Sequence, residues 1–455
     1  MNTFVAIVAY EIRRLVRDRA LVVLFILLLG FSSYAAWNGA NWVHEREAAI
    51  ELVKEEERAG MAERRQFVAR SYPSVILPAI QPVLPPGVMG AISIGQADAY
   101  PYVADVPTLG DYSDLFRRVW VDIANPDIRS AGPFDLAFVI VFLLPLIVLA
   151  ATYDLWSRER ERGVAAMVLS QPVSIAALIS AKALARGVVV LLPSTAILLF
   201  VAALAGARDT MGLTALALVV LAYGGFWLAL AVVINLIVRR STEAAIAVGA
   251  AWLLVVVMAP SLTLAAIDLL TPAPSKIHFT TDLKALKAEL AERQDLYREA
   301  NPSPLRRPAP KIPDRLRDLY ADRVALDTGI APMIEARQRA ENARRHTLDT
   351  ARFFLPSVAV QDALDRIAGS DADRALAFEK QARETQLKLR RLYKRYLDRD
   401  ALVTLVEYDN APGFHFREIN GGFQTGVLAD LASLFIATFL ILIAARVVRS
   451  QAGTP

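Results

Sequence analysis

Residues 211 to 238 read "MGLTALALVVLAYGGFWLALAVVINLIV" and contain no charged side chain. A helix on the surface of a soluble protein keeps a polar face toward water, so a helix that is apolar on every side lies in lipid or among other apolar helices. About 20 such residues cross the roughly 30 Å hydrocarbon core of a bilayer, at about 1.5 Å per residue. This segment therefore predicts a membrane-spanning helix.

Five further segments have the length and apolar composition of a membrane span. Hydrophobic residues make up 55% of the 455-residue chain, which exceeds the about 45 to 50% that is usual for soluble domains. We therefore expect an all-α integral membrane protein with six transmembrane helices. The expected spans are residues 20–37, 134–157, 179–206, 211–238, 243–269 and 426–446.

Basic residues gather in the loops on one side of these spans. Lysine and arginine are enriched in short cytoplasmic loops, and the short loop on the opposite side, "GARDTMG", carries only Arg208. We therefore expect both termini to be cytoplasmic. The basic residues are Arg13, Arg14, Arg17 and Arg19 before the first span, Arg158, Arg160, Arg162 and Lys182 after the second, Arg239 and Arg240 after the fourth, and Arg446 and Arg449 after the sixth.

Residues 1–19, before the first span, have the pattern of an amphipathic helix. Such a helix would lie at the cytoplasmic interface of the membrane; the alternative is that these residues only lengthen the first span. A cleaved signal peptide is a further alternative, but "SSYAAWNGA" makes a poor cleavage site and cleavage would leave five spans. The apolar side of the helix is formed by Phe4, Ile7, Val8, Ile12, Leu15 and Val16.

Two long segments, residues 38–133 and 270–425, lie on the extracytoplasmic side in this topology. The first begins with a charged, helix-forming run that lacks glycine and proline before Gly60, which predicts that the first span continues outward as one long helix. Prolines then crowd residues 72–110 and indicate extended or looped chain.

The second extracytoplasmic segment predicts helices near residues 281–300, 314–350 and 371–398. In the first of these helices, four apolar residues mark a stripe that we expect to be buried. We expect both segments to form one helical hairpin or small bundle on the membrane, which binds a partner or gates an exit path. The alternative is that its charge-rich helices only present solvated faces. The stripe consists of Leu283, Leu286, Leu290 and Tyr297.

The stretch 158–174, "RERERGVAAMVLSQPVS", connects the second and third spans in the cytoplasm. It is too polar to enter the membrane and too short for a domain. A short surface helix with charges at its start, a turn at Gly163, an apolar patch and a stop before Pro172 fits this composition. Such a helix would act as a lever on both attached spans. The alternative is that its charged side chains only flank the spans and face solvent.

The order glutamate, basic, glutamate, basic, glycine, then "SQPVS" and a lysine eight residues after Ser174, resembles the coupling-helix region of ABC-2-type transporter permeases. The stretch "NPDIRSAGPFDLAFVIVFLLPLIVLAATYDLWSRERERG" is similar to a bacterial subgroup with large extracytoplasmic insertions after the first and before the last transmembrane helix. Val164 departs from the threonine that often follows the glycine.

The resemblance implies a permease that works as a dimer, with a second copy or a paralogue, in the lipid of the bacterial inner membrane. Each coupling helix, within residues 158–178, would sit in a groove of a separate cytoplasmic ABC ATPase dimer that binds ATP and Mg. The residues that the resemblance assigns to this coupling region are Glu159, Glu161, Arg162, Gly163, Pro172, Ser174 and Lys182. The apolar patch of the short helix adds Val164, Met167 and Leu169 as candidates.

The chain lacks the signatures of catalysis, cofactor binding and metal binding. It has no cysteine and only four scattered histidines, and the patterns GxxxxGK[ST], HExxH and GxSxG do not occur. We therefore expect a non-catalytic membrane subunit without a cofactor or metal of its own. The net charge of +4 is small and its basic residues follow span ends, which disfavours nucleic acid as a partner.

Ionisable residues inside spans are functional candidates by default. Asp430, near the outer end of the last span, is the candidate for a translocation path. The leading hypothesis is export of an amphipathic or lipid-like compound, driven by ATP hydrolysis in another chain. The second is a mechanical transmitter that drives a periplasmic partner without moving a solute. An intramembrane enzyme is disfavoured because no catalytic constellation is present.

Overall fold

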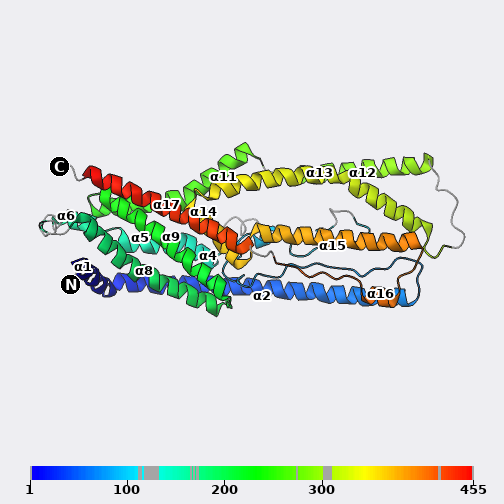
Figure 1. Cartoon of the computed structure of the whole chain (residues 1–455), viewed down its shortest axis with the longest axis horizontal. Helices are drawn as coiled ribbons and strands as arrows, with labels where there is room; N and C mark the ends of the chain where they lie inside the picture. The colour runs from blue at the N-terminus through cyan, green and yellow to red at the C-terminus, as the bar shows by residue number, and fades with distance from the viewer. Residues whose placement is uncertain are drawn as a thin grey trace.

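The computed structural model describes residues 3–110, 115–116, 133–163, 167, 170, 174–272, 275–300, 310–418 and 422–452. These residues form helices and extended connections and contain no β-strand, which confirms the all-α prediction. The molecule is elongated, and both termini lie at the same end as α6 (Ser157–Glu161) (Figure 1). The far ends of α12 (Lys276–Ala300) and α15 (Ala372–Arg399) lie at the opposite end.

Within the part of the chain that the structure describes, six helices are long and apolar enough to cross a membrane, as the sequence predicts. Two of them are composite, because a π-helical turn separates two α-helical parts. The spans are α2 (Arg19–Ala69); α4 (Leu136–Phe138) with η4 (Val139–Leu143) and α5 (Leu144–Thr152); α8 (Ile175–Leu204); α9 (Thr210–Ile237); α10 (Ser241–Trp252) with η5 (Leu253–Met258) and α11 (Ala259–Leu270); and α17 (Gly422–Ala452).

The amphipathic residues at the amino terminus form a helix of their own, α1 (Thr3–Val16), and do not lengthen the first span. The helix α1 ends at Val16, and Asp18 caps the next helix by accepting a hydrogen bond from the backbone N–H of Ala20 at 2.9 Å. Leu15 is buried, whereas Val16 is 66% exposed and lies outside the buried face.

The first span and the charged run after it form one continuous helix, α2, of 51 residues. At about 1.5 Å per residue this helix is about 76 Å long, more than twice the thickness of a bilayer core. It runs along most of the length of the molecule (Figure 1). The predicted continuation of the first span as one long helix is therefore confirmed.

The part beyond the spans is built jointly by both long segments. Its helices are the outer half of α2, α12, α13 (Asp314–Arg352), α15 and α16 (Leu405–Asp409). Residues 70–110 are extended chain and turns apart from the short helix Ala97–Ala99, and isolated bridges join Ile80 to Val106 and Val83 to Val103. The shared core contains Val68, Val75, Leu77, Ile80 and Val106 from the first segment, and Leu389, Tyr393, Tyr396, Leu397 and Val403 from the second.

The predicted apolar stripe of α12 is only partly correct. Leu283 is buried against α13, and Leu286 and Leu290 pack beside it. Tyr297 is 69% exposed, so its predicted burial is wrong. The contact with α13 is continued by polar side chains instead, because Gln294 donates to the Asp322 carbonyl at 3.0 Å.

A helix that the sequence did not predict, α14 (Pro356–Ala368), packs against the outer ends of the spans. Its apolar face joins the same hydrophobic cluster as α9 and α17. It ends at Gly369, which has φ +71°, and a Cβ on Gly87 would lie 2.0 Å from the Ala368 carbonyl oxygen. The two glycines thus let the loop at Gly87 touch the end of α14. The buried face consists of Val360, Ala363, Leu364 and Ile367.

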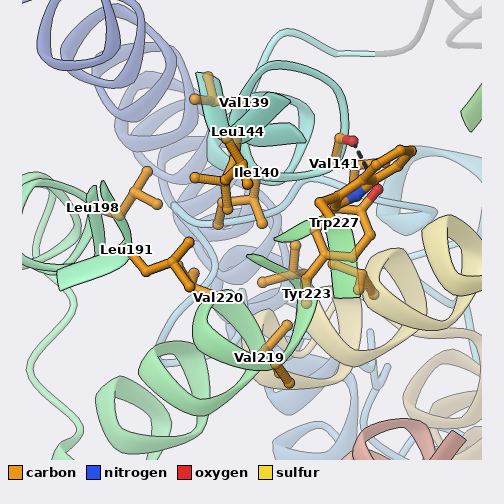
Figure 2. Close-up of a cluster of buried hydrophobic side chains, with 14 of the residues drawn as sticks. Val139, Ile140, Val141, Leu144, Leu191, Leu198, Val219, Val220, Tyr223 and Trp227 are labelled. Atoms are coloured by element: carbon orange, nitrogen blue, oxygen red, sulfur yellow. Dashed lines mark hydrogen bonds between the residues drawn. The ribbon is translucent and has the colours of Figure 1, made fainter. Parts of the chain in front are cut away.

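The centre of the bundle is apolar, and aromatic side chains from α9 and α10 bind carbonyl groups of the π-helical turn η4. Figure 2 shows Tyr223 and Trp227 packed against Val141 of η4. The Tyr223 hydroxyl donates to the Val141 carbonyl at 3.0 Å, and the Trp252 indole N–H donates to the Phe142 carbonyl at 3.1 Å. A π turn interrupts the regular helical ladder, so these side chains bind carbonyl groups in the irregular part of the span.

Candidate functional site

The short helix α6 follows the second span through a turn that is fixed from inside the bundle. Asn235 of α9 accepts hydrogen bonds from the backbone N–H groups of Trp156 and Ser157 at 3.2 and 3.3 Å. Its amide group donates to the carbonyls of Thr152 and Ala231 at 3.3 and 2.9 Å. One buried asparagine therefore joins the end of α5, the start of α6 and α9.

Glu159 of α6 forms an ion pair with Lys182 of α8. Lys182 is 5% exposed and its ammonium nitrogen lies 5.9 Å from the centroid of the Trp156 ring. A buried ammonium group is stabilised only when a counter-charge accompanies it. Glu159 is therefore not simply a solvated flanking charge, and the structure brings two of the predicted coupling residues together.

Glu161 and Arg160 bind the loop between the fourth and fifth spans. Glu161 accepts a hydrogen bond from the backbone N–H of Ser241 at 3.1 Å and another from the Ser241 hydroxyl. Arg160 donates to the carbonyls of Leu236 and Val238 at 3.2 and 3.3 Å. The five residues of α6 are thus bonded to α8, α9 and α10, and α5 lies directly before them in the chain.

A buried ion cluster beside α6 connects the interfacial helix α1 to the spans. Arg186 of α8 is 4% exposed; it donates to Asp154 at 2.7 Å, to the Ala151 carbonyl at 2.8 Å and to Glu11 at 3.3 Å. Asp154 also pairs with Arg158 at 3.0 Å. Glu11 was not among the predicted site residues, although an acidic residue between Ile7 and Leu15 on the apolar face of a helix indicates a buried partner.

The other predicted coupling residues have separate positions. Gly163 follows α6 with φ +73°, which confirms the predicted turn. Arg162 is the C-cap residue that follows Glu161, the last residue of α6, and Met167 is 71% exposed. Ser174 caps α8 by accepting from the Ala177 N–H at 3.2 Å. Val164, Leu169 and Pro172 lie outside the described residues.

At the opposite end of the bundle, Asp430 of α17 is completely buried. Its carboxylate lies 3.5 Å from the side-chain nitrogen Nε of Arg352, and neither carboxylate oxygen accepts a hydrogen bond within the described part of the chain. Arg352 also pairs with Asp362 of α14 at 2.5 Å. The helix α17 begins at Gly422, so Asp430 lies two turns inside it. Its role in a translocation path stays a prediction.

Two further buried carboxyl groups connect α14, the second span and the loop before it. Asp365 accepts from the Ser93 hydroxyl at 2.6 Å and from the Gln361 amide at 2.8 Å. Burial raises the pKa of Asp365 to about 8. Asp135 caps the second span by accepting from the N–H groups of Phe138 and Ile94 at 2.8 and 2.9 Å, and burial raises its pKa as well.

This geometry is that of a mechanical connection. Among the described residues, no group of three histidine, aspartate or glutamate side chains is placed to hold a metal ion. The polar clusters instead join helices, with α6, α1 and α8 at one end and α14, α17 and α4 at the other.

Comparison with known proteins agrees with this description. A protein-family model described as "ABC-2 family transporter protein" matches residues 5–448. The match therefore includes all six spans, α6 and the whole part of the chain beyond the spans. No curated protein matches the sequence.

Proposed function

Because the chain belongs to the ABC-2 transporter family, we propose that it is a permease subunit that couples ATP hydrolysis in a separate chain to export of an amphipathic or lipid-like substrate. Membrane subunits of this family are generally non-catalytic and imply a partner ATP-binding subunit. In this proposal ATP and Mg bind to a cytoplasmic ABC ATPase dimer, and α6 is the element that the ATPase moves.

The observation that carries the proposal is the set of bonds made by α6. The ion pair of Glu159 with Lys182, the bonds of Glu161 with Ser241, and the bonds of Arg160 with the end of α9 attach α6 to three spans at once. A displacement of α6 would therefore act on α8, α9 and α10 together. A loop that only carries solvated charges would not have the ion pair of Glu159 with the buried Lys182.

We also propose that the permease works with a second copy or a paralogue, with both termini in the cytoplasm of a bacterial cell and α13 and α15 on the periplasmic side. The position of both termini at the same end as α6 is consistent with this orientation (Figure 1). Because the chain has no cysteine, single-cysteine labelling tests it directly. Met167→Cys should react only from the inside and Arg395→Cys only from the outside; the reverse pattern would refute the orientation.

One observation favours a second candidate function, a mechanical transmitter. The helix α2 is one uninterrupted α-helix of 51 residues that includes the first span. Movement of the span would therefore displace the half of α2 beyond the span. Hydrolysis inside could then act on a periplasmic partner without moving a solute through the spans.

The coupling proposal is tested with a pair of proline variants in the permease reconstituted with its ATPase. Gly163→Pro acts next to α6, and Gly206→Pro acts in the loop between α8 and α9 at the other end of the bundle. Both glycines have positive φ, +73° and +97°, and a Cβ at either would meet no atom within 4 Å. Proline fixes φ near −65°, so the two variants impose comparable local strain.

Gly163→Pro and the charge reversal Glu161→Lys should leave membrane insertion intact and uncouple hydrolysis from transport, whereas Gly206→Pro should retain coupling. Normal coupling in both α6 variants would refute the lever assignment. Hydrolysis that is stimulated by a solute which then accumulates on one side supports export. Stimulation only by an added external protein supports the transmitter.

A further inference from the structure

The last three turns of α15 carry a stripe of cations on their exposed side. The opposite side of the same turns is buried in the shared core by Leu389, Tyr393, Tyr396 and Leu397. The exposed stripe has five cations and one carboxylate, so its net charge is +4, which equals the formal net charge of the whole chain. It consists of Lys388, Arg391, Lys394, Arg395 and Arg399, with Asp398.

Part of this charge has no partner within the described part of the chain. Lys394 pairs with Asp398 at 2.6 Å, but within the described residues no ion pair or hydrogen bond engages Arg391 or Arg395. The neighbouring Arg390, in contrast, is buried and donates to Asp327 at 2.7 Å. Structural arginines of α15 are therefore paired, and the exposed ones are left for solvent or for a ligand.

The stripe has a regular shape. Arg391, Arg395 and Arg399 recur every four residues, which places successive guanidinium groups about 6 Å apart along the helix axis. Together with Lys394 and Asp398 they line a shallow depression of about 300 Å³. A groove of this kind presents a row of donors that bind carboxylates in a bidentate manner.

The stripe is too far from the spans to bind the headgroups of the membrane that holds the protein. The helix α15 starts at Ala372, next to α14, and runs along the long axis of the molecule away from the spans (Figure 1). Lys388 and Arg399 follow Ala372 by about 24 and 40 Å at about 1.5 Å per residue. Charges in solution are screened over about 8 Å at physiological ionic strength.

We propose that the stripe is a docking surface for an acidic helix of an extracytoplasmic protein, with carboxylates at four-residue spacing opposite Arg391, Arg395 and Arg399. The inference rests on the proposed orientation, which places α15 outside the cell membrane. A protein is favoured over a single-stranded nucleic acid because nucleic-acid sites add aromatic platforms for base stacking, and Tyr393 and Tyr396 of the same turns are buried, with 3% and 8% exposure.

The test uses the full chain in nanodiscs of zwitterionic lipid and three probes. The first is a synthetic helical peptide with glutamate at every fourth position, the second is inorganic polyphosphate, and the third is a vesicle that contains anionic lipid. The variant Arg391→Glu/Arg395→Glu/Arg399→Glu reverses the stripe. The control Lys284→Glu/Arg315→Glu/Arg323→Glu makes the same change of charge at exposed positions of α12 and α13.

We expect the peptide to bind the wild type with an affinity that falls as the salt concentration rises. The stripe variant should bind the peptide with an affinity lower by a factor of roughly ten or more. The control variant should bind nearly as the wild type does. Equal weakening in both variants, no binding of the peptide, or binding of only polyphosphate or vesicles would overturn the proposal. ATPase stimulation is measured in parallel, because its loss in Gly163→Pro tests the transporter function independently of this surface.

Discussion

Replacing Arg186 with methionine should detach the amino-terminal helix from the bundle. Arg186 is 4% exposed and binds Glu11 at 3.3 Å, Asp154 at 2.7 Å and the Ala151 carbonyl at 2.8 Å. Asp154 keeps Arg158 at 3.0 Å as a second partner. Glu11 is 2% exposed and, among the described residues, keeps Arg14 at 3.7 Å as its remaining ion-pair partner. The substitution should therefore mainly weaken the contact between α1 and α8.

The expected cost is about 3–5 kcal/mol, which is typical when one partner of a buried ion pair is removed and the other stays charged. Since each 1.4 kcal/mol is a factor of ten in an equilibrium constant, amide protection of α1 should fall by about 100-fold or more. Hydrogen exchange of the protein in nanodiscs, read segment by segment, measures this opening. Adding Glu11→Gln to Arg186→Met should restore part of the protection, because the buried charge is then removed.

Arg14→Met is the matched control, since Arg14 also faces Glu11 but is 44% exposed. A pair of this exposure is worth less than about 1 kcal/mol, so α1 should lose less than about fivefold in protection. If Arg186→Met and Arg14→Met lower the protection of α1 equally, or if the double variant is no better than Arg186→Met, the buried ion cluster does not hold α1 and the reasoning is wrong.

Three other outcomes follow from single contacts. Asp365 has a pKa raised to about 8, so its stabilising contribution is complete below pH about 4 and is lost as pH rises through 8. Between pH 6 and 8, the free energy of local opening of α14, measured by its amide protection, should fall by about 2 kcal/mol. An equal pH dependence in Asp365→Asn would contradict this. Ser174→Ala removes the cap of α8 and should cost about 1 kcal/mol in unfolding experiments, whereas Ser180→Ala, which loses only bonds within its own helix, should cost less. Gly369→Ala imposes a side chain at φ +71° with its Cβ 3.1 Å from the Cα of Gly87 and should lower the stability of α14 by about 1–3 kcal/mol, while Gly413→Ala, which meets open space, should be nearly neutral.

The sequence predicted the spans well, because their signal is local and continuous. A stretch such as residues 211–238 excludes any fold but a spanning helix by its composition alone. The long helix α2 was predictable for a similar reason, since a run of good helix formers without an early glycine or proline has little alternative. The extended and looped chain of residues 72–110 was predictable from its prolines.

Features that depend on contacts between distant segments could not be predicted. The helix α14 is short and only amphipathic, so its docking on α9 and α17 has no sequence signature beyond Pro356 at its start and Gly369 after its end. The error at Tyr297 has the same origin. Beyond Leu290 the contact between α12 and α13 passes to Gln294 and Arg298, which bond to Asp322, so apolar periodicity no longer marks the buried side.

The candidate site shows the same division. A motif could single out Glu159, Glu161 and Lys182 by resemblance, but their partners depend on how the spans pack. Ser241, which binds Glu161, and Asn235, which binds the start of α6, are ordinary polar residues in the sequence. Only the burial of Arg186 against Glu11 shows that the interfacial helix belongs to the same cluster.

The bonded contacts of the described residues form a continuous route from α6 to the outer part of the molecule. The second span leads from α6 to the π turn η4, where the Phe142 carbonyl accepts a hydrogen bond from the indole N–H of Trp252 in the fifth span. The next π turn, η5, offers the Val255 carbonyl to the hydroxyl of Ser357 in α14, at 3.0 Å. Each link joins an irregular turn, where a helix bends most readily, to the adjacent helix. A displacement of α6 therefore has a physical path to α14, and from α14 through Arg352 to α13.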